Sequence, residues 1–404
     1  MYKGRVCFIK RLGLVWLCVF YLFLLGCQPN FAPQRTEINQ IELVQLMTID
    51  KCEKTGQIEV SVISKVGKNS GGTGDSDKET INAISGVGHT VFEAVRKLKS
   101  HSDKMIYFSH VEYFIIGEGA AADSFEKYFD VISRDPELRL TPKVYIAKGC
   151  MAKDLVFDTV SPEKYIIDRL KTMGDDEKVL GVTSEVSIIE VMNMLVTPNV
   201  ATVIPALERK EIHDEKSSTK LPEYDVVTAG YAMIKNFKLC GYIDSSLSRG
   251  HNFIVGKLSS TPISVKDFTG QYVALELISA KTKVKGHFKG KRLTGVTIET
   301  LVYSNVEEQH SSANIFTEES VVDLGDKQAK IIAEEMEKVI ELSQEIEIDC
   351  IELGKRIRMR YPFKWDDIEK DWGEIYPQLD IKVDVTTNVI RTYEINQPIG
   401  YEMD

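Results

Sequence analysis

The chain has 404 residues, 43% of them hydrophobic, and a formal net charge of −10. This length and composition allow two or three domains, each with a hydrophobic core of its own. So acidic a chain is a poor partner for nucleic acid, because phosphate backbones attract cationic surfaces.

The first 26 residues predict a bacterial lipoprotein signal peptide. Four basic residues precede an apolar run from Leu12 to Leu25 that contains no charged side chain. The run is shorter than the roughly 20 residues that a transmembrane helix needs. Gly26 and Cys27 then supply the small residue and the thiol that a lipoprotein signal peptidase requires. We expect cleavage before Cys27 and acylation of that cysteine, and the alternative is an uncleaved anchor helix with an incidental cysteine.

Cleavage would leave an acidic ectodomain on a short tether. It removes four positive charges and no negative ones, which takes the formal charge from −10 to −14. Because such a domain gains nothing from anionic lipid, the acyl group is expected to attach it to the bilayer, at about 0.8 kcal/mol per buried CH₂. Residues 27–35 contain two prolines and are expected to form an extended tether.

Cysteine spacing argues against a metal site and against a disulfide framework. Cys7 and Cys18 lie in the signal peptide, and the other four ectodomain cysteines are about a hundred residues apart with no CxxC pair. We expect four separate and mostly buried thiols. They are Cys52, Cys150, Cys240 and Cys350.

Residues 36–210 are expected to form an N-terminal α/β region of one or two subdomains. Alternating apolar residues predict strands over 43–50 and 58–66 that pair as a hairpin, and the glycine-rich residues 67–77 predict a mobile loop. A helix is expected over 90–98 with Thr90 as its N-cap. The later elements are expected as a buried strand over 104–116, helices over 125–132, 161–173 and 185–196, and strands over 144–147 and 200–207.

One pattern in this region is typical of nucleotide-binding enzymes. Residues 117–122, Gly-Glu-Gly-Ala-Ala-Ala, follow a predicted strand and open a helix, as in the phosphate-binding turn of dinucleotide folds. The next strand, however, ends in Ala147-Lys148 without the acidic residue that would bind the ribose. The sequence therefore favours a turn without a cofactor.

A second enzyme-like pattern is the pair Ser109 and His110. Neighbouring residues on a strand point to opposite faces, so these two side chains cannot form a nucleophile and base with each other. We expect His110, buried among the aromatic side chains around it, to be a hydrogen-bonded core or interface residue.

Residues 208–220 predict a domain boundary, because nine of these thirteen side chains are ionisable and Ile212 is the only aliphatic one. Residues 221–404 are expected to form a C-terminal α+β domain. Its hairpin would turn at Lys235-Asn236. Further strands are expected near 252–255, 271–284, 295–304 and 380–392.

A long helix from about residue 327 to 359 is expected to cover this twisted, antiparallel sheet, with an apolar stripe inward and glutamates outward. Pro362 would end the helical run. The expected fold class is therefore α+β and multidomain, with mixed or antiparallel sheets, covering helices, and a long C-terminal helix packed on a sheet.

A cluster of carboxylates near the C-terminal tryptophans is the third enzyme-like pattern. Trp365, Ile368 and Trp372 would share one helical face. The carboxylates around that face are Asp366, Asp367, Glu369 and Asp371. Paired carboxylates serve glycoside hydrolysis, but no apolar pocket is evident that would raise one pKa above another. The sequence thus predicts no catalytic residue, no metal ligand and no cofactor.

Several segments in a fixed order resemble one family. They are the lipobox ending in Cys27, Arg35-Thr36-Glu37-Ile38-Asn39, Phe108-Ser109-His110 leading to Ile115-Ile116-Gly117-Glu118, Arg134-Asp135-Pro136-Glu137-Leu138-Arg139, Gly230-Tyr231-Ala232 through Gly241-Tyr242-Ile243, Tyr361-Pro362-Phe363-Lys364-Trp365 with Trp372, and Asn388-Val389-Ile390-Arg391-Thr392. Together they resemble the Ger(x)C family, the C-subunit lipoproteins of spore germinant receptors. The chain departs from the family at Gln28-Pro29-Asn30, where a tryptophan and an aspartate are usual.

The resemblance implies several α/β domains without a recognised catalytic site. It implies anchoring through Cys27 to the outer face of the spore inner membrane, beside the membrane-embedded A and B subunits of a receptor for nutrient germinants. A tether of about seven residues would hold the domain near those partners, so that docking costs little further entropy.

Two other functions remain open from the residues. A solute-binding lipoprotein of a transporter would need two α/β lobes with a hinge, and ligand would stabilise its ectodomain. A lipid-anchored cell-wall hydrolase would digest peptidoglycan and lose that activity on removal of Asp366, Asp367 or Glu369.

Overall fold

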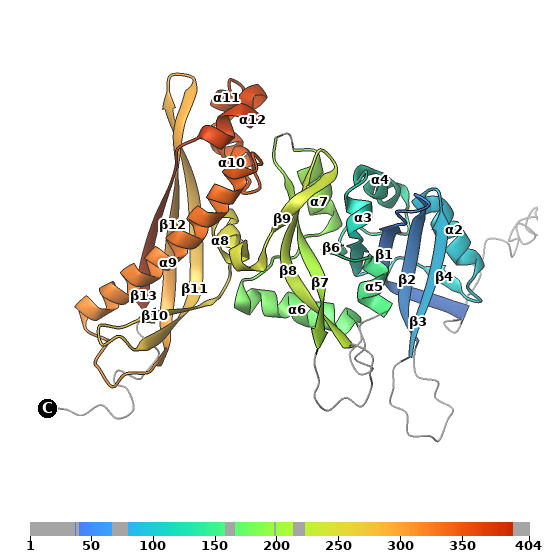
Figure 1. Cartoon of the computed structure of the whole chain (residues 1–404), viewed down its shortest axis with the longest axis horizontal. Helices are drawn as coiled ribbons and strands as arrows, with labels where there is room; N and C mark the ends of the chain where they lie inside the picture. The colour runs from blue at the N-terminus through green and yellow to red at the C-terminus, as the bar shows by residue number, and fades with distance from the viewer. Residues whose placement is uncertain are drawn as a thin grey trace, which may run out of the picture. The chain divides into compact units, whose positions relative to one another are not determined.

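The structure is a computed structural model that describes residues 37, 40–66, 80–157, 166–197, 199–212 and 223–390. Within them, two mixed sheets are each covered by helices (Figure 1). The expected α+β class is therefore confirmed. The predicted signal peptide, Cys27, the tether and the loop over 67–77 lie outside the described residues.

The first sheet contains nine strands in the order β3-β2-β1-β5-β6-β7-β8-β9, with β4 pairing to β1. Their bounds are β1 Ile41–Lys51, β2 Ile58–Val66, β3 Thr80–Gly88, β4 Met105–Tyr107, β5 Tyr113–Ile116, β6 Lys143–Ala147, β7 Thr202–Ile212, β8 Glu223–Lys235 and β9 Lys238–Ile243. Strands β1, β5, β6 and β7 run parallel, and antiparallel strands flank them on both sides. The carboxyl ends of the parallel strands therefore meet at one edge, where α/β sheets commonly bind ligands.

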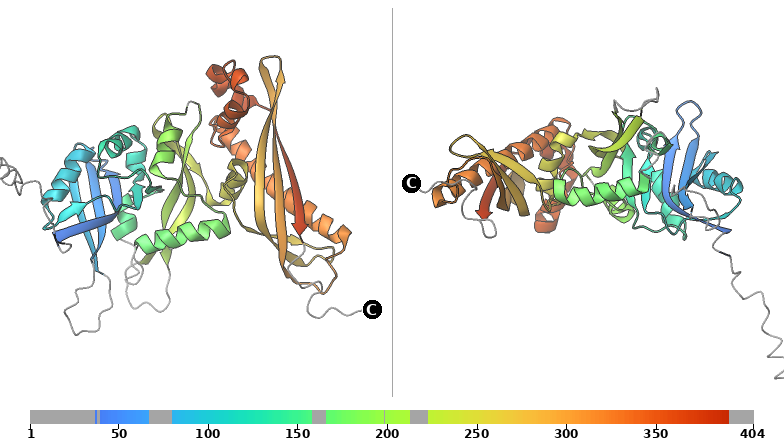
Figure 2. Two further views of the ribbon diagram at one scale, coloured as in Figure 1. Left: turned by 180° about the vertical axis from the view of Figure 1, so that it is seen from behind. Right: turned by 90° about the horizontal axis from the view of Figure 1, so that it is seen from below.

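Helices cover both faces of this sheet. They are α2 Val91–Ser100, α3 Glu118–Ala121, α4 Glu126–Arg134, α5 Ala152–Phe157, α6 Ile166–Leu180 and α7 Ile188–Leu195. One core cluster joins α2, α3, α4 and α7 to one face, and a second joins α5 and α6 to the other (Figure 2). The sheet is consequently buried on both faces, as parallel strands usually are.

Helix α2 shows how the sequence positions these helices. The side chain of Thr90 accepts a hydrogen bond from the Glu93 backbone N–H at 3.1 Å, which confirms the predicted N-cap. The helix lies so close to β3 that a Cβ on Gly86 would stand 2.2 Å from the Ala94 carbonyl oxygen. Glycine at this strand position is thus required by the packing of Ala94 against the sheet.

Two predicted features of the first half differ in the structure. The buried strand expected over 104–116 is two short strands, β4 and β5, separated by a turn at residues 109–110. The predicted boundary at 208–220 does not separate two sheets, because β7 on one side pairs antiparallel with β8 on the other. The charged residues 208–212 instead extend β7. How the chain divides into domains stays a prediction.

The second sheet has the order β10-β11-β12-β13, with antiparallel pairs except for the parallel pair β12–β13. Its elements are α8 Ser245–Val255, β10 Pro262–Lys266, β11 Tyr272–Lys289, β12 Arg292–Gln309, α9 Glu318–Glu345, α10 Leu353–Arg360, α11 Pro362–Trp365, η3 Glu369–Asp371, α12 Trp372–Ile375, η4 Tyr376–Gln378 and β13 Ile381–Ile390. Helix α9 lies across this sheet (Figures 1 and 2).

The long helix is confirmed, but its predicted bounds are wrong. It begins at Glu318, where Thr317 caps the Ser320 N–H, and it ends at Glu345 rather than near residue 359. Glu347 and Glu352 then adopt positive φ, which breaks the helix before α10 begins. Tyr361, with φ −132° and ψ 58°, ends α10, so Pro362 begins α11 instead of terminating the run.

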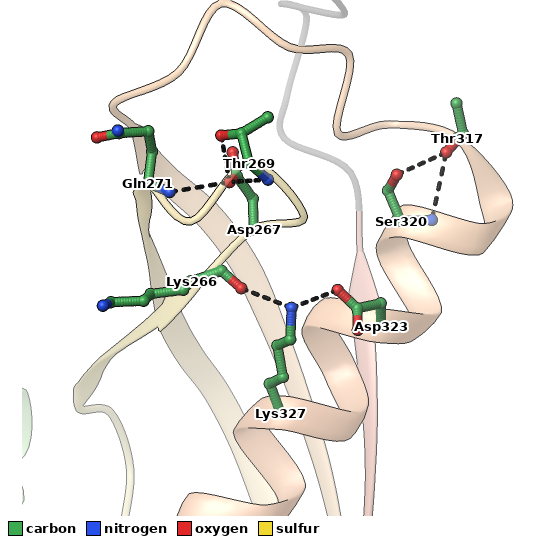
Figure 3. A network of polar contacts seen from close by, with 8 residues as sticks. All are labelled: Lys266, Asp267, Thr269, Gln271, Thr317, Ser320, Asp323 and Lys327. Atoms are coloured by element: carbon green, nitrogen blue, oxygen red, sulfur yellow. Dashed lines mark hydrogen bonds and ion pairs between the residues drawn. The ribbon is translucent and has the colours of Figure 1, made fainter.

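A polar network fixes the first turns of α9 to the loop after β10 (Figure 3). The Lys327 ammonium donates to the Lys266 carbonyl at 2.8 Å and pairs with Asp323 at 2.7 Å. The Asp267 carboxylate accepts from the backbone N–H groups of Thr269 and Gln271, which closes the loop. The start of α9 is therefore fixed in register against β10.

The strand predicted near 252–255 is wrong: these residues form the last turn of α8. Their aromatic and β-branched side chains resemble a strand pattern, but Gly256 ends a helix in the left-handed conformation, with φ 69°. A Cβ on Gly250 would stand 2.3 Å from the Glu335 carbonyl, so α8 packs directly on α9. Tertiary packing thus overrides local strand propensity here.

Candidate functional site

The glycine-rich turn follows β5 and opens helix α3, as predicted, and it lies where the carboxyl ends of β1, β5 and β6 meet. Gly117 caps the four-residue helix α3 after β5. A Cβ on Gly117 would stand 2.0 Å from an Asp50 carboxylate oxygen at the end of β1. The space that this glycine leaves open is therefore filled by a side chain of the protein.

Asp50 occupies this edge as an internal anion. It is buried, and its two oxygens accept hydrogen bonds from the Ala152 N–H at 2.6 Å and the Lys153 N–H at 2.9 Å, at the start of α5. Burial raises the pKa of Asp50 to about 6, while these two donors oppose the rise. The N–H groups of a helix start, which could bind a phosphate, already bind a carboxylate.

Glu118 is satisfied in the same way. Its Oε2 accepts from the Tyr242 hydroxyl at 3.0 Å and from the Gly149 N–H. Burial raises the pKa of the Tyr242 hydroxyl well above its ordinary range, so that this group stays a donor. Lys148, at the position of the ribose-binding acid in dinucleotide folds, pairs with Asp244 at 3.0 Å. The geometry of this turn gives no place for a nucleotide phosphate or ribose.

The expected burial of His110 is wrong. Ser109 and His110 form the turn between β4 and β5, and His110 is exposed because the strand ends before it. They line an open hollow of about 320 Å³ together with Glu112 and Glu185. The pair therefore lies at the surface, and the argument from opposite strand faces does not apply to it.

The C-terminal carboxylates lie on the outside of their helical segments, as expected. Asp366 and Asp367 are exposed, and Asp367 pairs with Lys291 at 2.7 Å. Trp365, Ile368 and Trp372 are all buried, although the single helix that the sequence suggested is divided into α11, η3 and α12. Asp366 and Asp367 therefore face water.

Sequence reasoning missed the buried carboxylates, among them Asp50 and Asp349. Asp349 accepts from the backbone N–H groups of Leu353 and Gly354 at 2.9 and 2.7 Å, and from the Trp372 indole N–H at 3.1 Å. Burial raises its pKa to about 6. Because three donors surround it, Asp349 connects the break after α9 to α10 and α12, and it has no open side for a substrate.

The four described cysteines are thiols without disulfide bonds, but they are less buried than expected. Cys350 is buried, Cys52 and Cys150 are half-buried, and Cys240 is exposed. Within the described ranges no group of three histidine, cysteine or acidic residues could hold a metal ion. Nor does any helix of the described part have the length and hydrophobicity to span a bilayer.

Helices α2 and α4 border mainly apolar hollows on one face of the first sheet. Two adjoining hollows of about 630 and 620 Å³ share Val91 of α2 and Val131 of α4, and we call them together the α2–α4 groove. Two large hydrophobic side chains at this groove face water: Phe92 is 54% exposed and Val196 is 77% exposed. Such a surface suits a hydrophobic protein segment better than a small polar solute.

Comparisons with known proteins define the class. Residues 34–209 match the family model described as "Spore germination protein N-terminal domain", and residues 229–393 match "Spore germination B3/ GerAC like, C-terminal". The two models together cover most of the chain in the expected order. The chain therefore belongs to the Ger(x)C family of spore germination proteins.

Individual relatives match over most of the chain. Spore germination protein KC of Bacillus subtilis (strain 168) is 22% identical over 409 residues, which cover 97% of this chain and 98% of that protein. Spore germination protein B3 of the same organism is 22% identical and covers 78% of this chain and 82% of that protein. The crystal structure of the GerBC protein has a TM-score of 0.51 at 18% identity, covers 85% of this chain and 96% of that one, and shares the fold.

Proposed function

We propose that the protein is the lipid-anchored C subunit of a nutrient-germinant receptor. Acylated Cys27 would hold it on the outer face of the spore inner membrane, where it would act as a non-enzymatic scaffold for the membrane-embedded A and B subunits. Family membership and the lipobox residues support this proposal. The receptor would need the subunit for its response to nutrients.

The α2–α4 groove is the observation that carries the interaction role. Exposed hydrophobic area of this kind costs free energy in water unless a partner covers it. The polar centres that could have suggested an enzyme are satisfied internally: Asp50 by two backbone donors and Asp349 by three donors. We therefore assign the groove to contact with one of the integral subunits.

The alternative functions have less support. A solute-binding lipoprotein requires two comparable α/β lobes around a hinge, whereas here one nine-stranded sheet is followed by a different, four-stranded one. A hydrolase that uses Asp366 or Asp367 would need one carboxyl in a less polar environment than the other. Both of these side chains are exposed.

Deletion of the gene followed by nutrient germination of dormant spores tests the proposal, with a Cys27→Ala strain in parallel. We expect loss of the nutrient response on deletion and a strong reduction in the Cys27→Ala strain. A normal response in both strains would refute the receptor role.

A matched pair of substitutions tests the groove. Phe92→Lys places a charge on the exposed face of α2, and Phe157→Lys does the same on α5, on the other face of the sheet. We expect Phe92→Lys to reduce nutrient germination. In detergent extracts of the membrane, this variant should also dissociate from its partner subunits more readily than the parent. Phe157→Lys should behave like the parent in both assays. Equal behaviour of the two variants, at equal protein levels, would contradict the assignment of the groove.

A further inference from the structure

The end of the β11–β12 hairpin and the neighbouring helices α10 and α11 form a surface that the receptor role does not explain. Figures 1 and 2 show the hairpin end as a narrow projection in the C-terminal half. We call this surface the basic tip. Its exposed residues are Lys289, Lys291, Arg292, Arg358, Met359, Arg360, Phe363 and Lys364.

Ring contacts join the hairpin to the helices. The rings of Phe288 on β11 and Tyr361 meet edge to face, with centroids 5.2 Å apart. The Lys364 ammonium lies 4.3 Å from the centre of the Phe288 ring, and Lys291 pairs with Asp367 at 2.7 Å. Residues from two distant parts of the sequence are therefore held on one surface.

Two of the most exposed hydrophobic side chains of the described structure lie on this surface. Phe363 is 90% exposed and Met359 is 76% exposed. The segment that carries them has a buried side chain at each end, Ile357 and Trp365. The segment is thus fixed from below by its core residues while it presents an aromatic ring and a thioether to the outside.

The charge of the surface is opposite to that of the chain. Residues 281–292 and 353–364 contain only basic and uncharged side chains, in a chain of net charge −10. Three acids form ion pairs with cations of these segments: Glu299 with Lys285, Glu352 with Lys355 and Asp367 with Lys291. The remaining exposed cations, Lys289, Arg292, Arg358, Arg360 and Lys364, form no ion pair with any described residue.

We infer that the basic tip binds the surface of a bilayer that contains anionic lipid. Phe363 and Met359 would enter the region between head groups and acyl chains, and the arginines and lysines around them would bind lipid phosphates. An acidic protein segment would satisfy the cations but leave the two hydrophobic side chains in water. Hydrophobic residues on a projection with cations beside them favour lipid as the partner. This contact is independent of the receptor role. The net charge of the chain is negative although this local surface is cationic.

Photo-crosslinking from single positions of the full-length chain tests the inference. The photoreactive residue p-benzoylphenylalanine replaces Phe363 in one protein and Phe268 in the control. Phe268 is 62% exposed and follows β10, at the other end of the sheet from the hairpin turn. Both proteins are reconstituted in vesicles of phosphatidylcholine, alone or mixed with radiolabelled phosphatidylglycerol, and irradiated.

We expect label from phosphatidylglycerol on position 363 at least about fivefold above position 268, and a loss of this excess in high salt. Arg358→Glu should remove the excess, whereas Lys266→Glu, the same charge change beside the control position, should keep it. Equal labelling at both positions would overturn the inference. The inference would also be overturned if, in membranes of the producing cells, position 363 crosslinked to protein and not to lipid, since the surface would then bind a protein.

Discussion

Replacement of Gly117 by alanine tests the account of the glycine-rich turn. Gly117 has φ −64° and ψ 151°, which alanine adopts without strain, so any cost must come from contact. The new Cβ would stand 2.0 Å from Asp50 Oδ1, and the carboxylate must move. Its bonds from the Ala152 and Lys153 N–H groups would then lengthen or break.

The magnitude follows from two contributions. Overpacking of a tightly packed site costs roughly 1–3 kcal/mol, and loss of one buried hydrogen bond to a charged acceptor costs about 1.5–3 kcal/mol. We therefore expect a loss of roughly 3–5 kcal/mol in the free energy of unfolding. For a region of this size that loss lowers the unfolding midpoint by roughly 6–20 °C.

The second glycine of the same pattern provides the control. A Cβ on Gly119 would meet only the Lys51 carbonyl, at 3.4 Å, and alanine is favoured in the helix that holds it. Gly119→Ala should keep the parent's stability within about 1 kcal/mol. Thermal and urea unfolding of the full chain measure both variants. In an Asp50→Ala background the cost of Gly117→Ala should fall sharply, as a double-mutant cycle would detect. If Gly117→Ala is as stable as Gly119→Ala, the assignment of the space to Asp50 is wrong.

Three further predictions concern other parts of the fold. Burial lowers the pKa of His251 to about 4, so the unfolded chain protonates first and up to about 3 kcal/mol of stability is lost as the pH falls from about 6.5 to 4. Asp349, whose pKa is raised, has the opposite effect and adds stability over the same pH range. The effect of His251 is therefore measured by urea unfolding of the parent and of His251→Gln at each pH. Parallel curves of unfolding free energy against pH for the two proteins would contradict the prediction. Trp372→Phe removes the indole N–H that donates to Asp349. It should lower the free energy of unfolding by about 1–3 kcal/mol more than Trp365→Phe, because the Trp365 indole N–H has no hydrogen-bond partner in the described structure. Thr90→Ala should cost about 1 kcal/mol in thermal unfolding, with Thr90→Ser close to the parent; equal losses would exclude capping as the cause.

Elements set by nearby residues could be predicted from the sequence. The cap at Thr90 and its helix depend on residues within one or two turns. The β8–β9 turn, predicted at Lys235-Asn236, lies one residue later, at Asn236 and Phe237, which both have positive φ, and Lys235 pairs with Lys238. In both cases the local pattern located the element, to within one residue for the turn.

Elements that depend on packing against distant parts of the chain could not be predicted from the sequence. Residues 252–255 have strand-like side chains, but they form a helix because Gly250 lets α8 approach α9, more than eighty residues later in the chain. The turn at Ser109 and His110 interrupts an aromatic run that looked continuous. Its strands are defined by pairing with β1, about sixty residues earlier.

The candidate site was only partly predictable for the same reason. The strand-turn-helix context of Gly117 was correct, but the donors that bind Asp50 come from α5, about a hundred residues away. Asp349 and its two backbone donors lie close in sequence. No sequence pattern predicts their hydrogen bonds, because the geometry depends on the positive φ of Glu352. Cys27 stays a prediction.

Strand β13 has a consequence for how the molecule is made. It pairs in parallel with β12 and packs beneath α9, where a Cβ on Gly325 would stand 3.0 Å from the Thr387 carbonyl. Every residue of α9 therefore leaves the ribosome before the strand that supports it. Until residues 381–390 emerge, the apolar stripe of α9 stays uncovered on that side, where chaperones can bind it. A chain truncated before residue 381 would keep that stripe exposed and would be a ready substrate for proteases.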